Sequence, residues 1–212
     1  PVEWLWTGRI AVGKLTLIAG DPGLGKSFLT LDLAARVSRG ARWPDGAGEH
    51  REPGGAILLN AEDDAADTLV PRLIAAGADL SRLMVLDAVG AMGDHGSVRA
   101  RTFDLSRDID ALDAAIARAE NCRLVVIDPV TAYLGGVDSH KNGDIRGLLA
   151  PLSALAAKRG VAVVAVTHLN KSAGGPAIYR AMGSLAFAAA ARAAWSVSRD
   201  RDDPARRLFL PI

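Results

Sequence analysis

A short glycine-rich segment carries the residue types and spacing that phosphate chemistry requires. It has the form G-x-x-x-x-G-K-S, and its residues are Gly20, Asp21, Pro22, Gly23, Leu24, Gly25, Lys26 and Ser27. Glycines let the backbone wrap a phosphate, because a Cβ would clash with the ligand or forbid the dihedral angles that are needed. The N–H groups of such a loop form an anion-binding nest at a helix N-terminus. The pattern therefore predicts a nucleotide-binding P-loop, which we extend to the next residue, Phe28.

Two side chains of this loop have separate roles in the prediction. Lys26 is expected to place its ammonium on the β- and γ-phosphates of ATP, and Ser27 to offer its hydroxyl to Mg²⁺. A glycine-rich turn with no ligand would have the same spacing. We favour nucleotide binding because residues 15–19 have the character of a buried strand and residues 28–39 that of a helix, which is the context of a P-loop.

Acidic residues follow two further apolar stretches. Asp128 ends the run LVVID, and Glu62 and Asp63 follow residues 56–60. Because ligands of α/β sheets bind where the strands end, we expect Asp128 to hold Mg²⁺, Glu62 to activate the attacking water, and Asp63 to be a second metal or water ligand. Asp128 would otherwise be an ordinary turn residue. Asp63 or Asp64 would otherwise cap a helix, and capping by Asp64 is compatible with a catalytic Glu62.

A polar pair, Thr167 and His168, ends another apolar stretch at residues 161–166. We expect His168 to sense the γ-phosphate and to pass the signal to the loop that follows. A histidine that is only hydrogen-bonded structure is the alternative. The histidines at positions 50, 95 and 140 have no metal-like spacing with each other or with Cys122, so we predict no structural zinc.

The pattern of apolar residues predicts elements that position these side chains at one edge of a sheet. Strands are expected at 15–19, 56–60, 83–89, 124–127, 161–166, 193–199 and 207–210, and helices at 28–39, 65–76, 108–120 and 144–159. This alternation predicts an α/β fold with a mostly parallel central sheet flanked by helices and closed by C-terminal antiparallel strands. We further expect Phe28 on the apolar face of its helix and a glycine-rich loop at 90–101. Trp4 and Trp6 are expected to pack at the sheet edge, and stacking on a nucleotide base is the alternative for this pair.

Composition limits the class of protein. The 212 residues are 50% hydrophobic, carry a formal net charge of +1 and include one cysteine. The even charge argues against a broad basic face for nucleic acid, although not against a narrow basic channel. One cysteine excludes an internal disulfide and favours a reducing cytoplasm. No apolar run is long enough to cross a membrane. We expect a single domain over residues 1–212, excised from a longer protein.

The order of the motifs resembles that of a known family. The segments GDPGLGKS, NAEDD, LVVIDP, VAVVAVTHLNKSAGG, RAMGS and AARAAW follow one another along nearly the whole chain. This order is similar to that of the RecA-like P-loop ATPases. Within them it most resembles the RepA-type hexameric replicative helicases of plasmids and phages and their AAA relatives.

The resemblance implies roles for individual residues. It makes Glu62 the catalytic glutamate, Asp128 the metal-binding aspartate and His168 the polar residue after the later strand. It implies that ATP sits between subunits of a hexameric ring and that a neighbour's basic residue completes each site. Arg180, in a pattern that resembles R-x-x-G-S, is the first candidate, and Arg192 is another.

The same resemblance implies a partner. The loops at 129–143 and 169–183 would face a central channel, where their basic residues would contact single-stranded DNA. Tyr133 and Tyr179 are the only aromatic residues available in these loops for stacking on bases. The expected activity is Mg²⁺-dependent ATP hydrolysis coupled to DNA translocation or unwinding. The alternatives are an ATP-dependent switch and a RecA- or RadA-like recombination ATPase without helicase activity. For the two loops taken alone, an ordinary solvated surface is the alternative.

Overall fold

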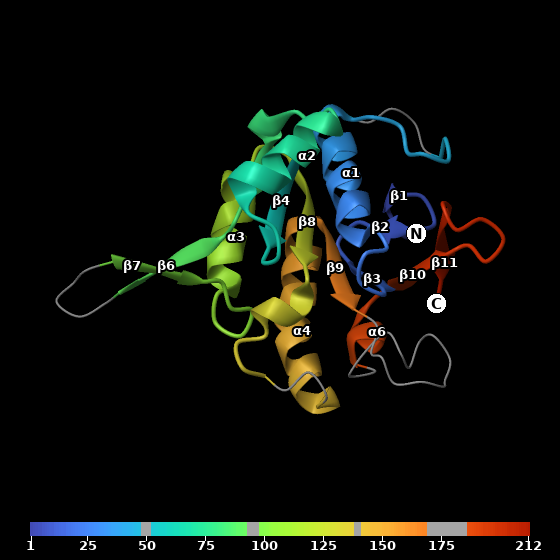
Figure 1. Ribbon diagram of the computed structural model, residues 1–212. Helices are drawn as coiled ribbons and strands as arrows, with labels where there is room; N and C mark the ends of the chain where they lie inside the picture. Colours follow the sequence, from blue (N-terminus) through green and yellow to red (C-terminus); the bar gives the residue numbers. More distant parts are fainter. Residues whose placement is uncertain (48–51, 93–97, 138–140, 169–185) are drawn as a thin grey trace.

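A central seven-stranded sheet organises the molecule in the computed structural model, which describes residues 1–47, 52–92, 98–137, 141–168 and 186–212 (Figure 1). The strand order is β11-β10-β3-β9-β8-β4-β5. The strands are β3 (Leu15–Gly20), β4 (Gly55–Asn60), β5 (Leu83–Val85), β8 (Cys122–Asp128), β9 (Ala162–His168), β10 (Ala193–Arg199) and β11 (Arg207–Pro211). All neighbours pair in parallel except β10 and β11, which are antiparallel. The predicted fold class is therefore confirmed.

Helices cover both faces of the sheet. The described helices are α1 (Lys26–Arg39), α2 (Val70–Ala75), α3 (Ile109–Arg118), α4 (Asn142–Arg159) and α6 (Ala186–Ala190). Side chains alternate between the faces, so that Leu17 packs with α3 and α4 in one core while Ile18 packs with α1 and α2 in the other. The central strands β3 and β9 are buried on both sides, as their near-continuous apolar sequences require.

The N-terminal residues form a small hairpin of β1 (Trp4–Trp6) and β2 (Ile10–Ala11). Trp6 is buried and stacks on Trp43 at 5.2 Å and on Phe209 at 5.9 Å between ring centroids. Phe209 in turn stacks on Trp195 at 4.7 Å. The expectation that tryptophan near the N-terminus packs against the edge of the sheet is therefore confirmed for Trp6.

The region after β5 differs from the expectation of one strand at 83–89 and a loop at 90–101. The strand ends at Val85, and a separate antiparallel hairpin follows, made of β6 (Ala88–Met92) and β7 (Val98–Thr102). This hairpin projects from the body of the molecule (Figure 1). Its base is held by Arg101, whose guanidinium donates to both carboxylate oxygens of Asp108 at 2.5 Å. The loop prediction was wrong because two strands that pair only with each other leave little hydrophobic signal in the sequence.

The helix expected at 65–76 begins differently from a regular α-helix. It starts as a single π-helical turn, η1 (Ala65–Leu69), and continues as α2. The Asp64 carboxylate caps η1 by accepting hydrogen bonds from the backbone N–H groups of Ala66 and Asp67, as the sequence suggested. Pro71 lies in the first turn of α2.

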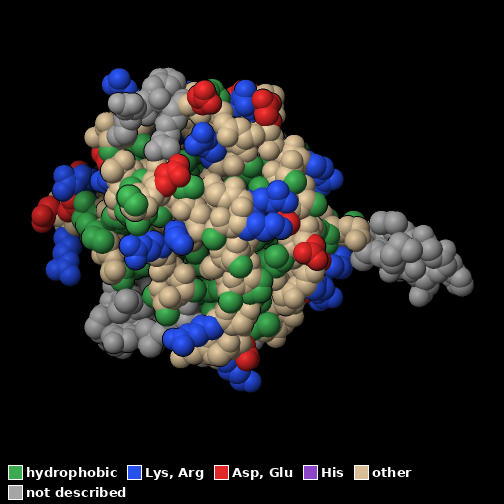
Figure 2. Space-filling view, turned by 180° about the vertical axis from the view of Figure 1, so that it is seen from behind, with side chains coloured by type: hydrophobic (Ala, Val, Ile, Leu, Met, Phe, Trp, Pro, Cys, Tyr) green, Lys and Arg blue, Asp and Glu red, His purple; other side chains and the backbone are tan. Residues whose placement is uncertain are grey.

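The surface carries charges of both signs. Seen from behind, Lys and Arg side chains are scattered between hydrophobic and acidic ones rather than gathered in one region (Figure 2). Among the described residues, no helix has both the length and the apolar character that crossing a bilayer demands.

Candidate active site

The carboxyl ends of four parallel strands bring the predicted site residues to one edge of the sheet. Gly20 at the end of β3 is the register partner of His168 at the end of β9. Asn60 at the end of β4 is the register partner of Asp128 at the end of β8. Because β8 and β9 are neighbours, the P-loop, the histidine and the acidic residues meet over one stretch of sheet edge.

The backbone of the P-loop explains why glycine stands at its key positions. Gly25 has a φ of 86°, a backbone conformation that residues with a side chain rarely adopt, and it immediately precedes α1. Gly20 lies so close to β10 that a Cβ there would be 2.6 Å from the carbonyl oxygen of Val197. The loop therefore turns sharply from β3 into α1 and leaves its N–H groups at the helix N-terminus, where anions bind.

Lys26 is held in the middle of the site. Its Nζ donates to the carbonyl oxygens of Gly20 at 2.8 Å and Asp21 at 2.9 Å, and lies 3.2 Å from His168 Nδ1. Burial lowers the pKa of Lys26, while the negative charges of Asp128, Glu62 and Asp21 act in the opposite direction. An ammonium placed in this way can receive a phosphate oxygen with little movement of the chain.

Asp128 is a buried carboxylate with few partners. It is 3% exposed, and its Oδ2 accepts a hydrogen bond from Thr30 Oγ1 at 3.4 Å. Burial raises the pKa of Asp128, whereas hydrogen bonding from the Ser27 hydroxyl and the charge of Lys26 lower it. A buried carboxylate beside a hydroxyl is the oxygen donor set that Mg²⁺ prefers, so these residues fit the predicted metal.

Glu62 lies at the solvent side of the site. Its side chain is 52% exposed, and its Oε1 is 3.1 Å from His168 Nε2. The turn that carries it is fixed by the Asn60 side chain, whose oxygen accepts hydrogen bonds from the N–H groups of Glu62 and Asp63 at 3.0 and 2.9 Å. The structure therefore brings the predicted Glu62, His168 and Lys26 into one hydrogen-bonded chain.

Asp63 is engaged differently from the sequence-based prediction of a metal or water ligand. Its Oδ2 accepts a hydrogen bond from Arg72 Nη1 at 2.7 Å, and the two side chains form an ion pair. Arg72 lies on α2 and was not singled out in the sequence, because its distance from the other motifs gives no recognisable spacing.

Phe28 is not part of the core, contrary to the expectation that it lies on the apolar face of α1. Its side chain is 61% exposed, while Leu31 and Leu33 carry the buried face of the helix. The guanidinium of Arg72 lies 4.7 Å from the centre of the Phe28 ring. The first helical turn faces the ligand side of the loop, so periodicity alone misplaces this residue.

An open cavity of about 690 Å³ extends over the loop. Its lining residues are Pro22, Gly23, Leu24, Gly25, Lys26, Ser27, Phe28, Glu62, Asp63, Arg72, His168, Ala205 and Arg207. The cavity thus collects most of the predicted loop and three of the predicted polar side chains, Glu62, Asp63 and His168, together with Arg72 and residues around the start of β11. Ala205 and Arg207 were missed because β11 reaches the loop only through its pairing with β10.

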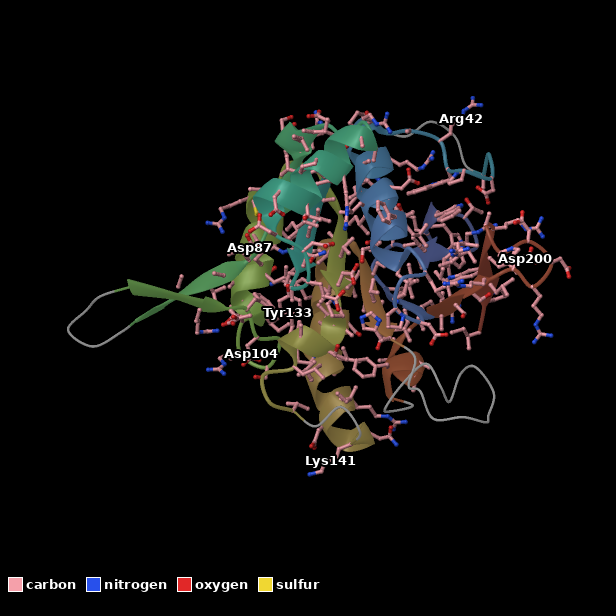
Figure 3. The ribbon with its side chains drawn as sticks, viewed as in Figure 1. Arg42, Asp87, Asp104, Tyr133, Lys141 and Asp200 are labelled. Atoms are coloured by element: carbon pink, nitrogen blue, oxygen red, sulfur yellow. The ribbon has the colours of Figure 1, made fainter. Side chains whose placement is uncertain are left out.

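Other predicted site residues lie elsewhere. Arg180 and the loop at 169–183 fall outside the described residues. Arg192 precedes β10 at the opposite edge of the sheet, where its N–H donates to the Leu15 carbonyl at 2.7 Å. Tyr133 is 1% exposed and lies inside the molecule (Figure 3), in η4 (Val130–Tyr133), so it is not available to stack on a nucleic-acid base.

Comparisons with known proteins agree with this architecture. A family model described as an AAA domain matches residues 1–174. The chain is 27% identical over 167 residues to the "DNA repair protein RadA" of Halalkalibacterium halodurans, covering 77% of this chain and 30% of that protein. It is 30% identical over 166 residues to the "DNA repair protein RadA" of Mycobacterium tuberculosis, covering 77% of this chain and 28% of that protein. The chain therefore spans less than a third of the length of these curated relatives.

Proposed function

The chain belongs to the AAA domain family and has the fold of a RecA-like P-loop ATPase, and from this premise we propose that it hydrolyses ATP with Mg²⁺ to move on single-stranded DNA. The proposed assembly is a RepA-like hexameric ring helicase, to which residues 1–212 contribute a single ATPase domain. The observation that supports hydrolysis best is the meeting of Lys26, Asp128 and Glu62 at one sheet edge.

Each of these residues has a proposed role in the reaction. Lys26 binds the β- and γ-phosphates and offsets the negative charge that develops on the transferred group. Glu62, exposed at the mouth of the site, orients the attacking water and accepts its proton. The loop N–H groups and the start of α1 fix the phosphates in place.

Ser27 and Asp128 are the proposed metal-binding pair, Ser27 by its hydroxyl and Asp128 through the water shell of the ion. Bound Mg²⁺ supplies electrostatic stabilisation to the phosphate oxygens. Asp63 is a weaker candidate as a ligand, because its carboxylate is already paired with Arg72. Loss of that ion pair on nucleotide binding would make Asp63 available to the metal or to water.

The proposed coupling of ATP hydrolysis to DNA movement depends on an adjacent subunit and on two loops of this chain. The loops at 129–143 and 169–183 are proposed to contact single-stranded DNA, and Arg180 to reach the γ-phosphate of an adjacent subunit. Lys141, within the first of these loops, and Arg146, in the first turns of α4, are both exposed and supply positive charge there. His168 directly precedes the second loop and contacts the site, which would link hydrolysis to DNA movement.

A second function is supported by the named relatives. Both are called DNA repair proteins, which favours a RadA-like repair or recombination ATPase that acts on DNA without unwinding it. The two functions share the ATP site and differ in what the assembled protein does to DNA.

ATPase measurements on the full-length assembled protein test the proposal. Single-stranded DNA should raise the hydrolysis rate, and the effect should weaken as salt increases, because phosphate contacts release counterions. Unwinding of a forked duplex together with rings in electron micrographs would support the helicase. Stimulated hydrolysis without unwinding, with filaments, would support the repair ATPase. ATP hydrolysis that DNA does not change would contradict both and favour a nucleotide-dependent switch.

A further inference from the structure

We propose that His168 is a positioning residue that engages the P-loop lysine before ATP binds and uses that contact to orient Glu62 for catalysis. The proposal rests on the proposed ATPase function and deepens it.

The direction of the hydrogen bonds follows from what each group can do. A lysine ammonium only donates hydrogen bonds, so the 3.2 Å contact between Lys26 Nζ and His168 Nδ1 requires a lone pair on Nδ1. The neutral imidazole then carries its proton on Nε2. Nε2 faces Glu62 Oε1 at 3.1 Å, and a carboxylate only accepts. The contacts with Lys26 and with Glu62 therefore require the same tautomer of His168, with the proton on Nε2.

The positions of the Lys26, His168 and Glu62 side chains depend on these hydrogen bonds. Lys26 has three N–H donors and three acceptors, namely the Gly20 and Asp21 carbonyls and His168 Nδ1. His168 uses both ring nitrogens. Glu62 is 52% exposed, and a long exposed side chain without a partner samples several rotamers. The contact with His168 restricts it to the side of the site where Lys26 lies.

Binding of a triphosphate changes which acceptors the Lys26 ammonium contacts. A phosphate oxygen needs one of the Lys26 donors, and all three already have protein acceptors. The Gly20 and Asp21 carbonyls belong to the loop itself, so the contact with His168 is the one that nucleotide displaces most readily. His168 thus competes with ATP for Lys26 while it positions Glu62 for the later chemical step.

This double role predicts opposite effects on binding and on chemistry. In His168→Phe, which keeps a ring but has no polar atoms, the dissociation constant for ATP should fall about fivefold, because a competing hydrogen bond is gone. The hydrolysis rate at saturating ATP should fall by on the order of a hundredfold, because Glu62 loses its orientation. His168→Gln carries an acceptor and a donor and should restore both values close to those of the original protein.

Binding is measured with a fluorescent ATP analogue, and hydrolysis in single turnovers of the full-length protein, with thermal melting as the check of folding. A residue that simply contacts the γ-phosphate would lose affinity when it is replaced. Weaker ATP binding by a folded His168→Phe variant would therefore overturn the proposal.

Nitrogen-15 spectra of the imidazole provide a test that requires neither hydrolysis nor DNA. Without nucleotide, His168 should show a protonated Nε2 and an unprotonated Nδ1. Lys26→Met combined with Glu62→Ala, which removes both ring contacts, should weaken this preference, and Lys14→Met, which changes an exposed lysine that directly precedes β3, should keep it. A protonated Nδ1 in the unsubstituted protein would refute the inference. Absence of ATP hydrolysis with the expected spectrum would count against the proposed function alone.

Discussion

At the scale of single residues, the site is arranged around two buried charges of opposite sign. Lys26 and Asp128 are 5% and 3% exposed. Burial disfavours the charged form of both, lowering the pKa of one and raising that of the other. A triphosphate would add negative charge beside Lys26, and Mg²⁺ would add positive charge beside Asp128, which favours the charged form of each. The site is thus electrostatically prepared for its proposed ligands.

Replacing the lysine tests the phosphate contact. Lys26→Ala should weaken ATP binding by about 10- to 100-fold, since hydrogen bonds to charged groups contribute about 1.5–3 kcal/mol. Lys14→Ala is the matched control, because Lys14 is exposed and directly precedes β3, at the end of that strand opposite the P-loop. Isothermal titration with a non-hydrolysable analogue measures both. Equal affinities for the two variants would rule out a role of Lys26 in phosphate binding.

Replacing the glutamate tests the assignment of the base. Glu62→Gln should bind ATP normally but hydrolyse it about 10² to 10⁴ times more slowly, because the amide cannot accept the proton of water. Glu120→Gln serves as the control, since the Glu120 side chain is 85% exposed and lies beyond α3. Phosphate release is the readout. Turnover by Glu62→Gln at the original rate would remove Glu62 from the mechanism.

Sequence was informative at this scale where a motif is local. The P-loop and the cap at Asp64 are contiguous patterns, and the structure has the loop at a strand–helix junction and the cap at η1. Phe28 was misjudged because periodicity does not tell which side of a helix faces a ligand. Arg72 and Arg207 reach the cavity from distant parts of the chain, so only the fold brings them there.

At the scale of elements, a close approach between two loops fixes the segment after β8. Gly135 has a φ of 61°, and a Cβ there would overlap the Asp104 carboxylate. The neighbouring Gly136 has a φ of 87° but nothing within 4 Å of the same position. A side chain at either position would strain the backbone, but only one at Gly135 would also overlap a neighbouring group.

Alanine at these two positions should have different effects on stability. Gly136→Ala should cost about 1–2 kcal/mol, the strain of a left-handed residue with a side chain. Gly135→Ala should cost about 1–3 kcal/mol more, because the overlap adds to the strain. Urea unfolding measures both, and equal losses would show that the Asp104 contact is not tight.

The base of the β6–β7 hairpin should make stability depend on pH. Hydrogen bonding from Arg101 and from the Asp104 N–H holds the pKa of Asp108 below its usual 3.8, against the effect of burial. A lowered pKa in the folded state contributes stability that is present above pH 3.8 and is lost as the pH falls below it. Asp108→Asn should therefore destabilise the protein by about 1–3 kcal/mol at pH 7, and the difference should shrink in acid.

Asp110→Asn provides the comparison, because Asp110 is an exposed residue of the same helical turn. Its unfolding curves should match those of the original protein at neutral pH. If Asp108→Asn behaved in the same way, the pairing with Arg101 would contribute nothing measurable to stability.

Helices and strands could be predicted where their apolar residues repeat with a clear period in the sequence. The central strands and the helices α3 and α4 follow clear apolar patterns, and they were expected within a few residues of their bounds. The hairpin β6–β7 gains its order from pairing and from Arg101, and neither leaves an apolar repeat in the sequence. The π-helical start of α2 likewise depends on packing that no local pattern encodes.

At the scale of the whole molecule, the two ends of the described chain are joined by stacked aromatic rings. Trp6 from the N-terminal hairpin and Trp195 from β10 both stack on Phe209 of β11. Arg9 lies over Trp6 and Trp195 and pairs with Asp45 at 2.6 Å. This aromatic column closes the β11 side of the sheet beside the P-loop strand.

Removing the middle ring should weaken this closure. Phe209→Ala should lower the free energy of unfolding by about 1–3 kcal/mol, because Phe209 is partly buried and stacks on two rings. Leu210→Ala is the control, since Leu210 is adjacent, 44% exposed and points to the other face of the strand. Thermal melting followed by circular dichroism compares them. Equal shifts in Tm would mean that the stacking is not stabilising.

The overall architecture was largely predictable because strands and helices alternate regularly, which leaves few ways to form a parallel sheet. The strand order was beyond local patterns, since it depends on which strand β3 pairs with on each side. The pairing with β10 brings the turn before β11 to the cavity.

The aromatic column also determines which part of this protein its intrinsic tryptophan fluorescence reports on. Three of its four tryptophans, Trp6, Trp43 and Trp195, belong to the column or stack directly on it. The aromatic side chain that lines the nucleotide cavity is Phe28, which absorbs and emits weakly by comparison. Intrinsic emission therefore reads the closure at the β11 side, and a dye on the nucleotide reads the P-loop. Packing of the aromatic column and nucleotide binding can therefore be followed at separate emission wavelengths in one sample.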